Sequence, residues 1–320
     1  MRRPDASSVF LLGWHVARRT PEGVVRGLMD VGALIAWALR GGGVRRLEAN
    51  LGRARPGADP RTLRRLSRQG MRTYLRYYGE AFLLGRLTRE QVDARVRGVG
   101  VEAVAAHVAA GQAVVLALGH QGNWDLAGAW ATRHIAPVTT VAERLEPPEV
   151  FAEFLALREG LGVQIIPLDG GSEVFRELLR AVRSGAGLVP LLADRDLTAR
   201  GVEVDLLGER ARVAAGPAAL AVSTGAPLVP TTIRHERLYG ERRRRAGTRW
   251  GIVITFHPEL PRSDGDRSSQ VAAATQGWVD VVGADIAAHP THWHMLQKVF
   301  VADLDPDRYA RTRAAGEAAA

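Results

Sequence analysis

The chain has 320 residues and 46% of them are apolar, enough to bury the core of one large α/β domain or of two small ones. It contains no cysteine, which excludes disulfides, thiolate metal sites and cysteine nucleophiles. The net charge of +9 is concentrated in residues 1–100, which hold 20 arginines against eight acidic residues. Such an excess of cations predicts an anionic partner, either nucleic acid or an anionic membrane, or a solvated basic surface.

Several other classes of protein are disfavoured by the same sequence. The basic segment lacks interleaved aromatic residues and any recognisable module for binding nucleic acid. No stretch reaches the roughly 18 consecutive apolar residues that a membrane-spanning helix needs. Because Arg18, Arg19 and Pro21 interrupt the first apolar run early, we expect no signal peptide.

The first third of the chain predicts helices. Residues 7–18 carry apolar side chains at helical spacing, and Thr20-Pro21-Glu22 is a good start for a second helix that the glycines at 41–43 end. Apolar residues recur along the second helix at Val24, Leu28, Val31, Ile35 and Leu39. Two interpretations stay open: a helical hairpin packed on the domain, or a helix pair in the membrane interface with Trp37 at the boundary. A longer helix is predicted over 61–85.

From Val101 onward, predicted helices and strands alternate. The helices are expected at 101–110, 124–132, 148–159, 173–183, 216–224 and 266–288. The strands are expected at 112–118, 137–142, 163–167, 187–193, 202–207, 227–233 and 248–256. The arginine run at 242–245 is typical of a solvated loop or hairpin. This alternation predicts a single three-layer α/β/α catalytic core over 101–305, behind an N-terminal helical subdomain at 1–100 and before a flexible tail at 306–320.

The motif from Gly119 to Asp125 joins the buried strand at 113–118 to the next helix. It delivers His120 to the carboxyl end of a strand, where open α/β sheets place their ligands. Asp125 falls in the first helical turn, and Asn123 is placed to cap that helix. A histidine and a carboxylate at this spacing predict a general base and the group that orients it. Alternatively, His120 merely ends the strand and Asp125 favours the helix dipole.

Polar residues also follow other predicted strands and helices. They are Glu143-Arg144, Arg158-Glu159, Asp194-Arg195-Asp196 and His292-Trp293-His294. Glu143 and Arg158 are alternatively a surface ion pair, and the aspartates alternatively cap a turn. The late histidines offer a further alternative, a zinc site shared with His120 and Asp125, since zinc needs three or four ligands. The absence of G-x-S-x-G, G-x-G-x-x-G and P-loop motifs disfavours α/β-hydrolases and nucleotide enzymes.

With these residues assembled, the chain resembles the H-x4-D acyltransferases, which include the glycerolipid and the lipid A biosynthesis acyltransferases. Within them it is most similar to the actinobacterial phosphatidylinositol mannoside acyltransferases. The resemblance runs over about residues 8–305 and is carried by Tyr74–Glu80, Gly119–Asp125, Ala142–Arg144, Arg158-Glu159, Ala193–Leu197, Gly216–Ala218 and His292–Gln297. The chain departs from the family at Leu206-Leu207-Gly208, where paired phenylalanines often precede the glycine.

The resemblance implies a glycerolipid-acyltransferase-like fold and acyl-CoA-dependent transfer of a fatty acyl group, palmitoyl by expectation, to a mannose hydroxyl of a phosphatidylinositol mannoside. His120 would be the base, held by Asp125, with backbone amides near Asn123 and Trp124 stabilising the oxyanion. The residues expected to line the site and bind substrate are Glu143, Arg158, Asp194, Arg195, Asp196, Glu203 and His294.

Acyl-CoA would act as co-substrate, with no metal and no other cofactor. The expected location is the cytoplasmic face of the inner membrane, as a peripheral protein on an anionic lipid surface. A basic nucleic-acid-binding α/β protein is the alternative from another class, and metal-assisted hydrolysis through the late histidines is a third.

Overall fold

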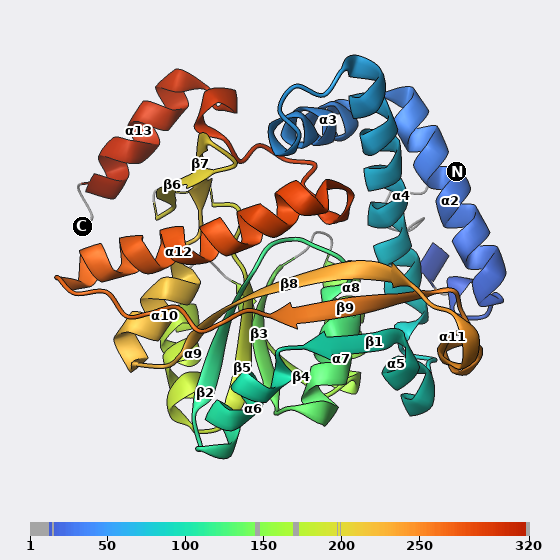
Figure 1. Cartoon of the computed structure of the whole chain (residues 1–320), viewed down its shortest axis with the longest axis horizontal. Coiled ribbons are helices and arrows are strands. Elements are labelled where there is room, and N and C mark those ends of the chain that lie inside the picture. The colour runs from blue at the N-terminus through green and yellow to red at the C-terminus, as the bar shows by residue number, and fades with distance from the viewer. Residues whose placement is uncertain are drawn as a thin grey trace.

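A seven-stranded sheet with the order β1-β9-β8-β2-β5-β3-β4 forms the centre of the molecule (Figure 1). The computed structural model describes residues 13–14, 16–144, 148–168, 173–196, 198 and 200–317. The strands of the sheet are β1 (Val96–Val99), β2 (Ala113–Leu118), β3 (Val138–Glu143), β4 (Val163–Leu168), β5 (Gly187–Leu192), β8 (Leu228–Arg237) and β9 (Trp250–Phe256). Neighbouring strands are parallel except β8 and β9, which are antiparallel. The sheet begins at β1, before residue 101.

Helices cover both faces of the sheet, as the alternating pattern predicts. One face packs against α9 (Glu173–Arg183), α10 (Gly216–Thr224) and α12 (Arg267–Ala288), and the other against α5 (Arg89–Arg95), α6 (Val101–Ala109) and α7 (Trp124–His134). The position of strand β2 between the two helical layers explains why its sequence is continuously apolar. Val115 and Ala117 belong to one core while Leu116 and Leu118 belong to the other, so both faces of the strand are buried. The three-layer α/β/α prediction is confirmed.

Three helices precede the sheet: α2 (Glu22–Leu39), α3 (Gly42–Ala54) and α4 (Pro60–Leu84). Helix α3 was not predicted, because Gly41, Gly42 and Gly43 suggest only a break. In the structure Arg40 adopts a left-handed φ of 49° that ends α2, and α3 starts two residues later with Leu47 fully buried. The predicted helix at 7–18 lies mostly outside the described residues.

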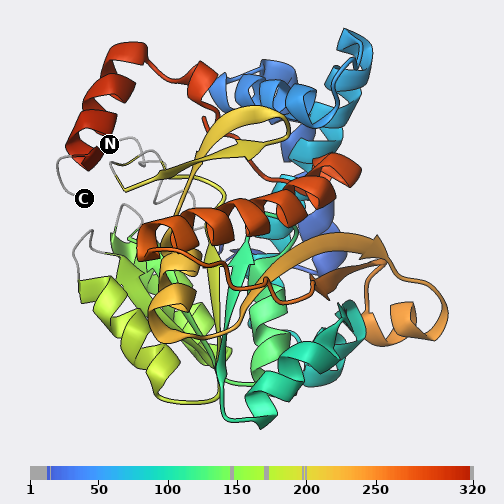
Figure 2. The ribbon, with the colours of Figure 1, turned by 60° about the vertical axis from the view of Figure 1, so that its left-hand side comes forward.

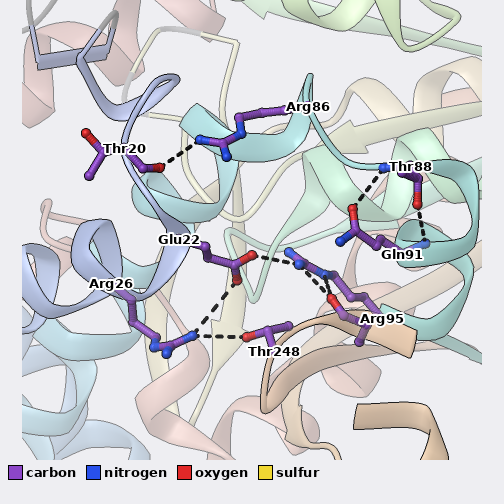
Figure 3. A network of polar contacts seen from close by, with 9 residues as sticks. Thr20, Glu22, Arg26, Arg86, Thr88, Gln91, Arg95 and Thr248 are labelled. Atoms are coloured by element: carbon purple, nitrogen blue, oxygen red, sulfur yellow. Dashed lines mark hydrogen bonds and ion pairs between the residues drawn. The ribbon is translucent and has the colours of Figure 1, made fainter. Parts of the chain in front are cut away.

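Contacts at the amino end of α2 tie this helix to the α/β layers (Figure 3). Arg95 donates through Nη2 to Glu22 at 2.8 Å and to the carbonyl of Ala246 at 2.8 Å, and its side chain is only 3% exposed. Arg26 donates to Thr248 at 3.2 Å. Because a buried guanidinium is costly without partners, this network fixes α2 against the body of the protein.

Five other elements differ from the sequence predictions. Helix α5 and strand β1 were not predicted, and β7 (Glu209–Val213) pairs with β6 (Val202–Leu206) through a two-residue turn at Leu207 and Gly208, both at positive φ. The arginine run lies in a short helix, α11 (Gly240–Ala246), held by Arg242, which donates to the carbonyl of Ala94. The predicted tail is helical as α13 (Pro306–Glu317), since Asp-Pro-Asp is a helix start and arginine and alanine favour helix.

Figure 2 shows the β6–β7 hairpin, α13 and the N-terminal helices gathered beyond one end of the sheet. The remaining elements are α8 (Pro148–Gly160), between β3 and β4, and two single turns, η1 (Pro290–His292) and η2 (Val301–Asp303). The predicted turn at 169–172 lies outside the described residues. No helix in the described part of the chain is both long enough and apolar enough to span a membrane.

Candidate active site

His120 stands just beyond β2, and its ring is held by a carboxylate from the neighbouring strand. Nδ1 of His120 lies 2.5 Å from Oδ1 of Asp194, which follows β5. The backbone N–H of His120 also donates to Oδ2 of Asp194, at 2.9 Å. The His120 side chain is 37% exposed whereas that of Asp194 is 2% exposed. The imidazole is therefore supported from the protein side and open on its other side.

Asp194 is held in place by a third segment. The indole Nε1 of Trp293 donates to Oδ2 of Asp194 at 2.7 Å. Around it, the backbone N–H of His294 donates to the carbonyl of His120 at 2.8 Å, and that of Gly122 donates to the carbonyl of His292 at 3.1 Å. The ends of β2 and β5 and the late histidine segment thus form one hydrogen-bonded unit.

The electrostatics of the pair favour an imidazole that attracts a proton. Burial lowers the pKa of His120, but attraction to Asp194 and their hydrogen bond outweigh it, so the pKa lies above its usual value. Burial raises the pKa of Asp194, and the interaction with His120 more than offsets this, leaving that pKa below its usual value. Asp194 is therefore the ionised acceptor, and Nδ1 of His120 carries the proton that it accepts.

Asp125 has other partners, so the predicted pairing of His120 with Asp125 is wrong. Oδ1 of Asp125 accepts from Nε of Arg158 at 2.7 Å, and Oδ2 accepts from the hydroxyl of Tyr77 at 2.8 Å. The physical reason lies in the sheet. Leu118 pairs in register with Leu192, so the residues two positions beyond each, 120 and 194, are brought together. The start of α7 instead places Asp125 between α4 and α8.

Asn123 caps α7 as predicted, its Oδ1 accepting from the backbone N–H of Leu126 at 3.0 Å. Its Nδ2 donates to Glu80 of α4 at 2.8 Å, and Glu80 also contacts Nε2 of His235 at 3.3 Å. Burial raises the pKa of Glu80, but His235 and Asn123 lower it more. The turn needs glycine at 122, where φ is 61° and a Cβ would lie 2.6 Å from the carbonyl oxygen of Ile233.

Aromatic rings pack behind and beside His120. Trp124 meets His120 edge to face with ring centroids 5.7 Å apart, and lies 4.1 Å from Tyr77. His294 is 6% exposed, and neither of its ring nitrogens has a hydrogen-bond partner among the described residues. Burial lowers the pKa of His294 well below its usual value. Its ring is therefore a neutral part of the packing, and its backbone contacts His120.

Of the other predicted site residues, two lie around His120 and two have separate contacts. Glu143 and Arg195 are exposed and act on the pKa of His120 through their charges, Arg195 lowering it and Glu143 raising it. Asp196 caps a turn, accepting from the backbone N–H of Thr198 at 2.8 Å, which is the alternative the sequence left open. Glu203 on β6 contacts Arg210, Arg212 and Tyr309.

A pocket lies between α7 and the sheet and is partly open to solvent. The residues along its walls include Leu116, Leu118, Ala127, Gly128, Ala131, Val138, Leu161, Val163, Leu188, Ile233, Ile254 and Phe256. Trp124, Asp125 and Arg158 also line it. Because Trp124 touches the ring of His120, the apolar space begins beside the proposed base.

The late histidines do not assemble with the predicted partners. Nδ1 of His292 faces the backbone N–H of His235 at 3.3 Å. Burial, with the nearby charges of His235 and Arg76, lowers the pKa of His292 to about 3. Among the described residues, no group of three or more His, Asp or Glu side chains is placed to share a metal ion.

Sequence reasoning missed Tyr77 and Trp293 as members of this site. Both stand in the blocks that carry the resemblance, one among the tyrosines of α4 and the other between two histidines. A tryptophan bounded by polar residues is a signal that its N–H has a specific acceptor, since buried indoles usually find one.

The comparisons with known proteins identify the family of this chain. The sequence model of the family described as bacterial lipid A biosynthesis acyltransferase matches residues 4–301. The chain belongs to this family. It is an acyltransferase, because the family and its curated relatives share that activity.

Two relatives show how far the similarity extends. The phosphatidylinositol mannoside acyltransferase of Mycolicibacterium smegmatis is 39% identical over 305 residues, covering 94% of this chain and 93% of that protein. The protein of the same name from Mycobacterium tuberculosis H37Rv is 40% identical over 313 residues, covering 95% and 91%. The solved PlsC acyltransferase of Thermotoga maritima superposes on this acyltransferase with a TM-score of 0.37 and 14% identity, covering 85% of this chain and 99% of that chain.

Proposed function

We propose that this acyltransferase moves a fatty acyl group from acyl-CoA to a mannose hydroxyl of a phosphatidylinositol mannoside, with His120 as general base. The observation that carries the proposal is an accessible imidazole, backed by the buried Asp194, beside an apolar pocket. The names of the two mycobacterial relatives support the choice of acceptor.

The geometry gives each group of the pair a role. Asp194 accepts the Nδ1 proton of His120, which leaves Nε2 with a free lone pair. As the acceptor hydroxyl attacks the thioester carbonyl, Nε2 takes its proton, and Asp194 stabilises the imidazolium that forms. When the tetrahedral intermediate collapses, the C–S bond breaks, and the imidazolium returns the proton to the departing thiolate. The products are the ester and free CoA, with no covalent enzyme intermediate.

The start of α7 supplies donors for the oxyanion of the intermediate. The helix begins at Trp124, so its first backbone N–H groups have no acceptor within the helix. We assign oxyanion stabilisation to the amides near Asn123 and Trp124, where the positive end of the helix dipole favours negative charge. This role is independent of the Asn123 side chain, which caps Leu126.

The pocket and the charged residues around His120 suit different substrates. The apolar space along α7 suits the alkyl chain of the donor, with palmitoyl as the expected group. The charged side chains of Glu143 and Arg195, exposed around His120, suit the sugar hydroxyls and phosphate of a glycolipid. The buried pair of Asp125 and Arg158 contributes by fixing the wall of the pocket.

Helix α2 supports binding to a membrane surface. Its outer face exposes Val24 (51%), Leu28 (65%), Val31 (56%), Leu34 (41%), Ile35 (55%) and Leu39 (77%). Its inner face buries Val25 and Ala33. A continuous apolar stripe exposed on a helix is typical of an interfacial contact, so the interfacial interpretation of α2 is the better supported of the two. We place the protein at the cytoplasmic face of the inner membrane, as a peripheral protein.

Trp37 differs from the predicted arrangement. Its Nε1 donates to Ser67 at 3.1 Å, and the guanidinium of Arg64 lies 3.9 Å above its ring. The indole therefore packs toward α4. The apolar stripe also favours a lipid partner over nucleic acid for the basic first third, because phosphate backbones are bound by cations and not by exposed leucines.

The proposal is tested with the purified full chain, labelled palmitoyl-CoA, and phosphatidylinositol with and without mannose. We expect label on the mannosylated lipid, released as fatty acid by mild alkali, and almost none with His120→Ala. Transfer by His120→Ala at the wild-type rate would refute the assignment of the base. Equal labelling of unmannosylated lipid would refute the proposed acceptor.

A further inference from the structure

Small residues form the wall that α7 presents to the pocket. Ala127, Gly128 and Ala131 line the space, on the turns of the helix that follow Trp124. With a rise of 1.5 Å per residue, Gly128 lies about 6 Å along the helix axis from Trp124, and Ala131 about 10 Å. Position 128 is therefore well inside the pocket and away from His120.

Two destabilising features coincide at Gly128. Protein interiors are normally close-packed, and an unfilled space between a helix and a sheet forfeits the contacts of its lining atoms. Glycine in a helix interior also destabilises the helix relative to alanine. Helix α7 uses alanine at Ala127, Ala129 and Ala131, so glycine at 128 stands out. A void and a weak helix former kept at one place indicate that the space is reserved for a ligand.

The direction of a side chain at 128 is defined by the structure. A Cβ built on Gly128 would lie 3.4 Å from Cγ2 of Val163 on β4, which is ordinary to tight contact. A longer side chain would enter the space lined by Leu161 and Val163. The open volume between α7 and β4 thus depends on the absence of a side chain at this position.

We propose that Gly128 determines the acyl chain length that the enzyme accepts, by keeping the α7–β4 part of the pocket open for the distal methylenes. The inference rests on the proposed function, since it takes the pocket to hold the alkyl chain of the donor. Burying one methylene favours binding by about fourfold. Leucine at 128, with a bulk of roughly three to four methylenes, is expected to lower the preference for long over short chains on the order of 100-fold.

The test compares kcat/KM for octanoyl-, lauroyl-, palmitoyl- and stearoyl-CoA with one acceptor and the full chain. Gly128→Leu should lose palmitoyl transfer and retain octanoyl transfer, while Gly128→Ala should shift the profile only slightly. Val163→Ala, which enlarges the same space, should raise stearoyl relative to palmitoyl transfer. Gly160→Leu is the matched control, because Gly160 is an exposed helical glycine with no atom within 4 Å of its Cβ position.

A second measurement separates this inference from the proposed function. Displacement of a bound fluorescent fatty acid by C8 to C18 fatty acids measures the affinity of the pocket for each chain length. This measurement needs no transfer reaction. Loss of the preference for long acids in Gly128→Leu, with an unchanged melting temperature, supports the inference even if no glycolipid is acylated. If Gly128→Leu weakens all chain lengths equally, or keeps the wild-type profile, the inference is overturned.

Discussion

Asp194 lies 2.5 Å from Nδ1 of His120 although the two residues are 74 positions apart in the chain. The aspartate five positions after His120 is instead bound to Arg158 and Tyr77. The two carboxylates therefore have different tasks, one setting the protonation of the base and the other holding the pocket wall. Substitutions at each position are expected to give distinct results.

Replacing Asp194 with Asn should lower kcat by about 10²- to 10⁴-fold, since the imidazolium loses its counter-ion and the tautomer is no longer fixed. The acid limb of the pH profile of kcat/KM, where activity rises with pH, should also shift. Activity rises as pH passes the pKa of His120, because only the neutral ring takes a proton. Asp194 raises that pKa, so its loss leaves burial to lower it, and the limb should shift to lower pH. Asp196→Asn, two residues on, is the control, and an unmoved limb in Asp194→Asn would contradict the pairing.

Replacing Asp125 with Asn should act mainly on stability. The change leaves the buried Arg158 without its charged partner, which typically costs about 3–5 kcal/mol of unfolding free energy. Urea denaturation measures this loss, and Glu173→Gln, which breaks an exposed ion pair, should cost less than about 1 kcal/mol. We expect the acid limb of the pH profile to stay where it is in the wild type. If the acid limb of Asp125→Asn instead shifts as it does in Asp194→Asn, Asp125 acts on the pKa of His120.

His292 should make the folded protein sensitive to acid. Its pKa is lowered to about 3 in the folded state, whereas an unfolded histidine titrates near 6.5. Below pH 6.5 the unfolded chain therefore binds a proton that the folded chain does not, and stability falls as pH decreases. Protonation of His292 in the unfolded chain should lower the unfolding free energy by about 2 kcal/mol at pH 5. In His292→Asn the side-chain oxygen can still accept from the N–H of His235. The unfolding free energy of this variant should fall less between pH 7 and pH 5 than that of the wild type. An equal fall in the two proteins would exclude His292 as a source of the acid sensitivity.

The exposed stripe of α2 should govern membrane binding. Leu28→Glu with Ile35→Glu removes two apolar side chains from the interface, each contributing about 1.5–3 kcal/mol when buried. Partitioning onto anionic liposomes, measured by sedimentation, should fall at least about 100-fold, while the melting temperature stays near that of the wild type. Leu168→Glu, an exposed leucine far from α2 in the sequence, is the control. Unchanged sedimentation of the double variant would remove α2 from the membrane contact.

Local sequence signals predicted the framework of the site. The apolar run before Gly119, the cap at Asn123 and the alternation that follows gave β2, α7 and the three layers, because each depends on neighbours within a few residues. The same signals failed for α3, where glycines predicted only a break, and for α11, where an arginine run predicted a loop or hairpin. They also failed where a short segment gains its structure by pairing, as β7 does with β6 and β1 with β9.

The sequence by itself determined that a histidine stands at the end of a buried strand, that a helix starts directly after it, and that α2 carries an apolar stripe. Only the tertiary structure decided which carboxylate meets that histidine, because the choice depends on β5 lying in register beside β2. It also decided that Trp293 holds this carboxylate, that Glu203 faces Arg212 and Tyr309, and that space remains between α7 and the sheet. Contacts between distant segments follow from how strands and helices pack, and residue spacing along the chain does not encode them.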